Sequence, residues 1–170
     1  MNLANRVTLA RIALIPLVIV FLFLGLNGLA VIFFILLSLS DYLDGHIARR
    51  YNQISDAGKI LDPLADKILV LSVLITLAWQ GKADPIPVIL FLARDEIVSG
   101  IRISAAKSQK ILHASPIAKA KTVTQMIAVP LLILDLPYAG WVLWLAVVFS
   151  LLSGGIYLWQ SKILKLLRSS

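Results

Sequence analysis

The chain has 170 residues, no cysteine and a formal net charge of +7. Hydrophobic residues make up 59% of the sequence and the mean hydropathy is +0.91, whereas a soluble domain is about 45–50% apolar. This composition excludes disulfide and thiol chemistry. It also favours a membrane protein over a nucleic-acid-binding protein, because anionic headgroups and cytoplasmic loops both favour Lys and Arg. We therefore expect a lipid bilayer, and no nucleic acid, among the partners.

Six apolar segments follow one another along the chain. They cover residues 7–26, 28–48, 60–80, 85–106, 116–135 and 139–164. Each has about the 20 residues that a helix needs to cross the hydrocarbon core of a bilayer. We therefore predict an all-α integral membrane protein in which residues 1–170 form one domain of six transmembrane helices. A cleaved signal peptide over residues 1–30 is the alternative for the first segment, but apolar sequence resumes directly after it.

Turn-forming and basic residues mark the connections between these segments. Turn signals stand at residues 25–28, 81–85 and 134–137, where Gly, Asn, Asp and Pro gather. Lys and Arg are concentrated at both ends of the chain and around the second and fourth connections. The positive-inside rule then predicts a multi-pass protein of the cell membrane with both termini in the cytoplasm.

Four aspartates lie on either side of the second connection: Asp41, Asp44, Asp62 and Asp66. A charged residue at the centre of a membrane helix costs roughly 2.5–3.5 kcal/mol, so this group requires a compensating partner. The first two are three residues apart and the last two are four apart, so each pair shares a helix face. Two antiparallel helices would bring the four carboxylates together, where they repel unless a cation intervenes. Oxygen ligands of this kind suit Mg²⁺ or Mn²⁺.

Two other interpretations of the aspartates remain open. One is an internal ion-pair network with Arg49, Lys59 and Lys67. The other is a proton or metal transport site, because intramembrane carboxylates also mark ion pathways. A transport site is expected nearer the middle of the membrane than these aspartates, which share one membrane face.

The aspartates are part of a longer pattern. Residues 41–49 read Asp-Tyr-Leu-Asp-Gly-His-Ile-Ala-Arg, and residues 58–66 read Gly-Lys-Ile-Leu-Asp-Pro-Leu-Ala-Asp after eight intervening residues. This pattern resembles the signature of the CDP-alcohol phosphatidyltransferase family, D-x2-D-G-x2-A-R-x8-G-x3-D-x3-D. All eight fixed positions match at the family spacing. His46 departs from the apolar or aromatic residue that is frequent there, and we assign it no role.

The resemblance implies a six-helix fold, usually homodimeric, with a polar active-site cavity open to the cytoplasm. It implies a divalent-metal cofactor, Mg²⁺ or Mn²⁺ with two ions expected, whose ligands are Asp41, Asp44 and Asp62. It makes Asp66 a ligand or neighbour of the metal and the general base.

The resemblance further places the CDP group against Gly45, Ala48, Arg49 and Gly58. In the first segment, Thr8 and Arg11 are three residues apart and could border the same group. The alternatives are packing or helix capping for Thr8 and positive-inside bias for Arg11. Snorkelling to the headgroups is the alternative for Arg49.

Other stretches bear on the acceptor. Residues 5–16, 62–67, 93–102 and 119–125 resemble the corresponding stretches of bacterial phosphatidylglycerophosphate synthases. The resemblance implies transfer of the phosphatidyl group from CDP-diacylglycerol to sn-glycerol 3-phosphate, giving phosphatidylglycerol phosphate and CMP. Other acceptors known in the family, such as inositol phosphate, serine or phosphatidylglycerol, remain alternatives.

Basic residues in the second half of the chain also favour a phosphorylated acceptor. Arg94 and Arg102 are eight residues apart on the fourth segment, about 12 Å along a helix, and Lys119 and Lys121 begin the fifth. Arg and Lys both suit a phosphate dianion. We therefore predict that these four residues bind the acceptor phosphate.

Neighbouring acidic residues offer an alternative for these cations. Asp95 and Glu96 adjoin Arg94 and could pair with the basic residues instead of a phosphate. Asp95, Ser99 and Arg102 also share one helical stripe, so Arg102 could be partly structural.

Overall fold

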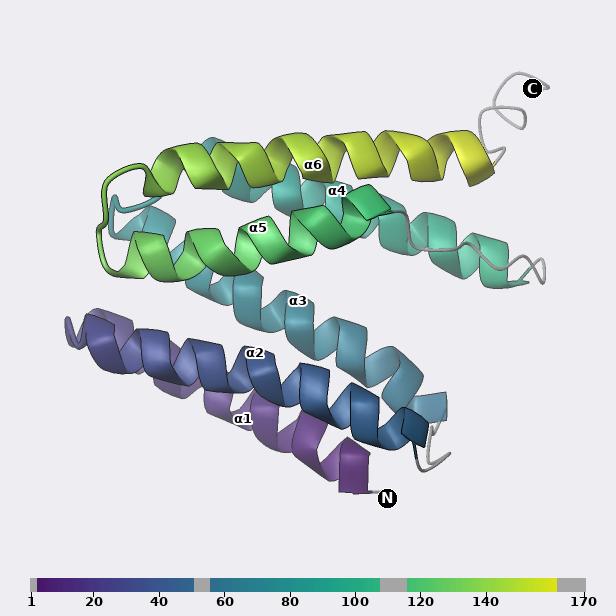
Figure 1. Cartoon of the computed structure of the whole chain (residues 1–170), viewed down its shortest axis with the longest axis horizontal. Helices are drawn as coiled ribbons and strands as arrows, with labels where there is room; N and C mark the ends of the chain where they lie inside the picture. The colour runs from purple at the N-terminus through teal and green to yellow at the C-terminus, as the bar shows by residue number, and fades with distance from the viewer. Residues whose placement is uncertain (1–2, 51–55, 108–115, 162–170) are drawn as a thin grey trace. The chain divides into compact units, whose positions relative to one another are not determined.

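A computed structural model describes residues 3–50, 56–107 and 116–161, and the side chains of residues 8–40, 64–102 and 116–159. That part of the chain is helical and contains no strand. The helices are α1 (Leu3–Phe23), α2 (Asn27–Arg50), α3 (Asp56–Trp79), α4 (Pro85–Lys107), α5 (Pro116–Ile133) and α6 (Ala139–Ser161) (Figure 1). The six predicted helices are thereby confirmed.

Three helices end where the turn signals predict, and all three ends have the same geometry. The residues Gly25, Gly81 and Asp135 have φ of 70°, 73° and 57°, a left-handed conformation that Gly adopts freely and Asp tolerates. The next residue then donates to a carbonyl five positions back, as in Leu26 N to Phe21 O at 2.9 Å. This is the Schellman arrangement, which satisfies carbonyls that the helix end leaves unpaired. It ends α1 at Phe23, three residues before the predicted boundary.

The first compact unit contains residues 1–83 and 129–136. In it α1 packs against both α2 and α3. Its fully buried apolar side chains include Val18, Leu22, Phe34, Leu69, Val73 and Leu77. Across α1 and α2, the rings of Phe21 and Phe33 lie 5.2 Å apart. Gln80 Nε2 donates to Leu22 O at 3.0 Å, which ties the end of α3 to the end of α1.

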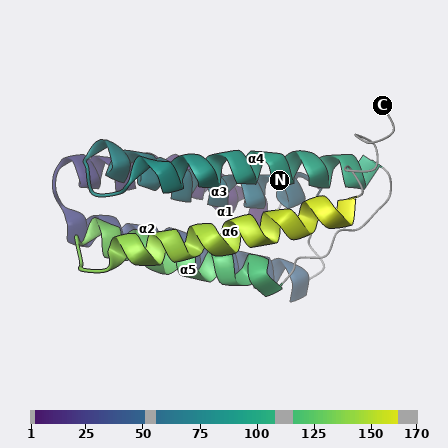
Figure 2. The same cartoon turned by 90° about the horizontal axis from the view of Figure 1, so that it is seen from above.

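The second compact unit contains residues 84–128 and 137–170. In it α4 packs against α6, and the two helices run side by side in the same direction (Figures 1 and 2). Their fully buried side chains include Phe91, Leu143, Ala146 and Tyr157. The register is shown by two pairs in the same order along both helices, since Arg94 contacts Ser150 and Arg102 contacts Tyr157. The two arginines of α4 are thus placed against matching positions of α6.

Hydropathy distinguishes α6 from the other helices in the described part of the chain. Residues Ala139–Trp159 are long and apolar enough to cross a membrane, judged by length and composition. Thr8–Phe23 and Asn27–Ser40 form shorter apolar stretches. α4 contains Arg94, Asp95 and Glu96 in its middle, and such charges lower the mean hydropathy of any window that includes them.

Candidate active site

The four signature aspartates lie on two consecutive helices of the first unit. Asp41 and Asp44 belong to the C-terminal half of α2, and Asp62 and Asp66 to the N-terminal half of α3. Only residues 51–55 separate these helices, so both aspartate pairs lie at the same end of the unit. The sequence prediction of two carboxylate pairs on adjoining helix ends is therefore matched by the helix boundaries.

Side chains are described for only part of this region. The predicted ligands Asp41, Asp44 and Asp62 lie outside the described side chains, as do the predicted CDP-site residues Gly45, Ala48, Arg49 and Gly58. Asp66 is described; its side chain is half-buried and has a polar partner. Among the described residues alone, no group of three or more His, Cys, Asp or Glu residues forms a metal-binding cluster.

α1 brings two buried polar residues beside the start of the aspartate pattern. Thr8 and Arg11 are 1% and 2% exposed. Arg11 Nε donates a hydrogen bond to Ser40 Oγ at 3.3 Å, and Ser40 directly precedes Asp41 in the chain. A cation so deeply buried does not fit the alternative in which Arg11 only follows the positive-inside bias. The predicted role of Arg11 beside the CDP group stays a prediction, because the signature residues predicted to contact that group lie outside the described side chains.

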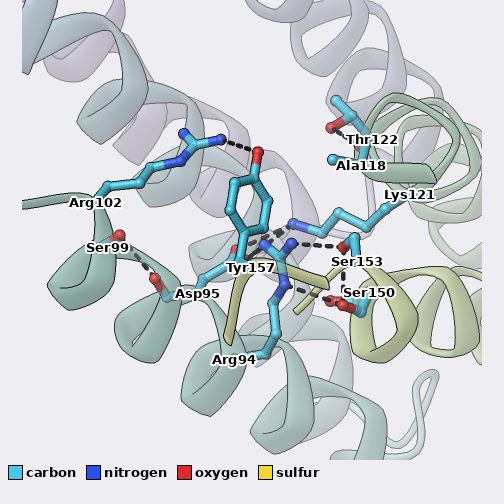
Figure 3. Close-up of polar contacts among 10 residues, drawn as sticks. All are labelled: Arg94, Asp95, Ser99, Arg102, Ala118, Lys121, Thr122, Ser150, Ser153 and Tyr157. Atoms are coloured by element: carbon cyan, nitrogen blue, oxygen red, sulfur yellow. Dashed lines mark hydrogen bonds and ion pairs between the residues drawn. The ribbon is translucent and has the colours of Figure 1, made fainter. Parts of the chain in front are cut away.

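Asp95 is the centre of a buried ionic cluster in the second unit (Figure 3). It is 6% exposed. Arg94 Nη1 donates to its Oδ1 at 2.8 Å, and Lys121 Nζ donates to Oδ1 and Oδ2 at 3.2 and 3.1 Å. We call Arg94, Asp95 and Lys121 the Asp95 cluster. It joins α4 to the first half of α5, and it shows the ion pairing that the sequence left open as an alternative to phosphate binding.

Arg94 makes three hydrogen bonds, one from each guanidinium nitrogen. In addition to the bond to Asp95, Nε donates to Ser150 O at 3.1 Å and Nη2 donates to Ser153 Oγ at 2.6 Å (Figure 3). Its side chain is 12% exposed. With its nitrogens so engaged, Arg94 has a structural role between α4 and α6. That role favours the ion-pair interpretation for Arg94 over phosphate binding.

The other two predicted acceptor residues are placed differently. Arg102 is exposed, and its Nη2 donates to Tyr157 Oη at 2.7 Å. This contact gives Arg102 a partly structural role, and on the same helical stripe Ser99 Oγ donates to the Asp95 backbone carbonyl at 2.7 Å. Lys119 is exposed near the start of α5. Arg102 and Lys119 are thus the two predicted acceptor residues whose side chains are exposed.

Sequence reasoning missed the residues of α6 that hold the arginines. Ser150, Ser153 and Tyr157 lie at positions i, i+3 and i+7, which share one helix face. A polar stripe in the helix with the highest mean hydropathy was the signal that could have revealed them.

Gly154 on α6 lies close against Arg94, and this leads to a testable difference between two neighbouring glycines. A Cβ at Gly154 would lie 3.2 Å from Arg94 Cγ, whereas a Cβ at Gly155 would meet nothing within 4 Å. Gly inside a helix costs about 0.5–1 kcal/mol relative to Ala, so Gly155→Ala should raise stability by that amount. Gly154→Ala should give no gain, because the three hydrogen bonds of Arg94 prevent it from moving aside. Thermal unfolding of both variants measures this, and equal melting temperatures would contradict the Arg94 contacts.

Comparison with known proteins covers nearly the whole chain. The sequence pattern of the CDP-alcohol phosphatidyltransferases matches residues 1–152. A protein of Rickettsia bellii (strain RML369-C) named CDP-diacylglycerol–glycerol-3-phosphate 3-phosphatidyltransferase is 39% identical over 168 residues, covering 92% of this chain and 93% of its own. A protein of the same name from Bacillus subtilis (strain 168) is 37% identical with the same coverage.

A relative with a different name is also similar. The cardiolipin synthase (CMP-forming) of Streptomyces coelicolor (strain ATCC BAA-471 / A3(2) / M145) is 35% identical over 159 residues, covering 88% of this chain and 72% of its own. The chain belongs to the CDP-alcohol phosphatidyltransferase family.

Proposed function

We propose that this protein is an enzyme of phospholipid biosynthesis that transfers the phosphatidyl group of CDP-diacylglycerol to sn-glycerol 3-phosphate. The products are phosphatidylglycerol phosphate and CMP. The observation that carries this proposal is the 37–39% identity, over 92% of the chain, to proteins named for that reaction. The complete aspartate pattern between Asp41 and Asp66 supports the same chemistry.

In the proposed reaction, an acceptor hydroxyl attacks the lipid-side phosphorus. A new P–O bond forms to that hydroxyl oxygen, the phosphoanhydride bond breaks, and CMP leaves with the bridging oxygen. Asp66 accepts the hydroxyl proton as general base. Its side chain on α3 is half-buried.

A divalent cation, Mg²⁺ or Mn²⁺, fits the donor set. Asp41, Asp44 and Asp62 supply the carboxylate oxygens that such hard cations prefer, and Asp66 completes the group. Bound metal would supply positive charge to the pyrophosphate and to the departing CMP. Gly45, Ala48, Arg49 and Gly58 would contact the CDP group.

We assign the acceptor phosphate to the exposed cations of the second unit, Arg102 and Lys119. Arg94 and Lys121 belong to the proposed site less directly, because the Asp95 cluster already holds them. Arg11 and Thr8, both buried on α1, are assigned to the CDP side.

The enzyme would act within the cytoplasmic leaflet of the cell membrane, as a multi-pass protein with both termini in the cytoplasm. Exposed large apolar side chains on all six helices support this proposal: Leu14, Ile32, Ile75, Ile89, Ile127 and Leu152. Large exposed apolar surface marks contact with a membrane or a partner. A homodimer built from single-domain chains of residues 1–170 is part of the same proposal.

The direct test is CMP release by the purified protein in detergent, supplied with CDP-diacylglycerol and Mg²⁺ or Mn²⁺. We expect release to depend on glycerol 3-phosphate and to stop when EDTA removes the metal, because the aspartates would then repel one another and the pyrophosphate. Inositol phosphate, serine and phosphatidylglycerol serve as alternative acceptors. Release that depends on one of these and not on glycerol 3-phosphate would refute the assigned acceptor, and undiminished release in EDTA would refute the metal.

A further inference from the structure

One face of α6 contacts both arginines of α4. Ser150 and Ser153 accept hydrogen bonds from Arg94, and Tyr157, one turn further along, accepts one from Arg102 (Figure 3). Because the two helices run in the same direction, this order is preserved along the interface. The face therefore fixes where two cations of the second unit lie.

The two arginines differ in whether their guanidinium nitrogens remain available to a ligand. Arg94 uses all three nitrogens of its guanidinium on protein atoms and is 12% exposed in its side chain. Arg102 is exposed, and its hydrogen bond to Tyr157 uses the terminal nitrogen Nη2. A guanidinium has five N–H groups in a planar fork. Arg102 is therefore held from one side and remains open to a ligand from the other.

Tyr157 is suited to hold that side chain still. It is 1% exposed and is among the largest fully buried side chains of the described residues. Its hydroxyl lies 2.7 Å from Arg102 Nη2, and its ring centroid lies 5.0 Å from Arg102 Cζ. The contact thus combines a charge-assisted hydrogen bond with a cation–π interaction. Both come from a ring that close packing keeps in place.

Restraining a long cation before the ligand arrives has a consequence for binding. An exposed Arg loses rotamer freedom when it binds a ligand, which weakens the affinity. Where a buried ring has already fixed the guanidinium, part of that loss occurs during folding. The affinity for the phosphate-bearing substrate is therefore higher, whereas the rate of the chemical step is unchanged.

We infer that Tyr157 is a positioning residue for acceptor binding: it holds Arg102 in the orientation that receives the phosphate group of glycerol 3-phosphate. This inference rests on the proposed function. Tyr157 lies beyond the family match, which ends at residue 152, so its role follows from the contacts in this protein.

Tyr157→Phe tests the inference by removing only the hydroxyl. Loss of a hydrogen bond to a charged group weakens binding about tenfold, so we expect the KM for glycerol 3-phosphate to rise by that factor. The kcat and the KM for CDP-diacylglycerol should change less than twofold. Tyr138→Phe is the matched control, because Tyr138 is 76% exposed in the same unit and is assigned no part in acceptor binding.

A double-mutant cycle shows whether Tyr157 acts through Arg102. Arg102→Ala alone should raise the KM for glycerol 3-phosphate at least as much, and Tyr157→Phe should add nothing in that background, since residues that act as a unit are non-additive. Additive effects would overturn the inference, as would an unchanged acceptor KM in either single variant. Equal rises in both substrate KM values would show a merely structural tyrosine and would also overturn it.

The outcome for the wild-type protein separates this inference from the proposed function. If the wild type releases no CMP with glycerol 3-phosphate, the proposed function fails and the positioning role fails with it. If the wild type is active and Tyr157→Phe has wild-type kinetics, only the positioning role fails.

Discussion

Replacing Asp66 with Asn is expected to lower the kcat for CMP release by about 10²–10⁴-fold, the range of a lost general base. The amide is nearly isosteric with the carboxylate but cannot accept the hydroxyl proton. The KM for glycerol 3-phosphate should change little, because the acceptor phosphate is assigned to other residues. The measurement is steady-state CMP release at saturating CDP-diacylglycerol and metal.

Asp84→Asn is the matched control for this substitution. Asp84 Oδ1 accepts a hydrogen bond from Ile86 N at 2.9 Å, so it caps the start of α4, and Asn caps a helix about as well. The control should therefore retain wild-type activity. If Asp66→Asn kept more than about a tenth of the wild-type kcat, Asp66 could not be the general base.

Replacing Asp95 with Ala is expected to give the largest loss of stability, about 3–5 kcal/mol. Asp95 lies 2.8 Å from Arg94 Nη1 and 3.1 Å from Lys121 Nζ, and all three side chains are at most 12% exposed. Without the carboxylate, the buried cations Arg94 and Lys121 would repel each other, and neither would have its anionic partner. The free energy of unfolding, followed by circular dichroism in detergent with denaturant, measures the effect.

Glu96→Ala is the control that shows whether the loss of any negative charge from α4 lowers stability as much. Glu96 is the adjacent carboxylate on the same helix, but it is exposed. Exposed ion pairs contribute about 0–1 kcal/mol, so this variant should stay close to wild type. Equal stabilities of Asp95→Ala and Glu96→Ala would contradict the ionic cluster.

The helices could be predicted because their signals are local. Apolar runs of about 20 residues predicted the number of helices, and the turn signals that include Gly25, Gly81 and Asp135 predicted three of their ends. A left-handed backbone conformation depends on one residue and its near neighbours in the chain, so it can be predicted from the local sequence. The approximate placement of the aspartates at adjoining helix ends followed from the short connection between α2 and α3.

The partners of the basic residues could not be predicted in the same way. Spacing along one helix relates Asp95 to Arg102, yet Arg102 contacts Tyr157 on α6 and Lys121 reaches Asp95 from α5. Such pairs depend on the register between helices, which side-chain packing determines and which no spacing rule encodes. The sequence therefore predicted Arg94 as a phosphate ligand, whereas in the structure its nitrogens bind Asp95, Ser150 and Ser153.

Mass spectrometry of the lipid product is the decisive test of phosphatidyl transfer to glycerol 3-phosphate. The protein is incubated with CDP-diacylglycerol, Mg²⁺ and glycerol 3-phosphate labelled with ¹³C in the glycerol carbons. We expect labelled phosphatidylglycerol phosphate and CMP in equal amounts, because one acceptor hydroxyl displaces one CMP. CMP that forms without the labelled lipid, or a labelled product that carries the cytidine, would contradict transfer of the phosphatidyl group to glycerol 3-phosphate.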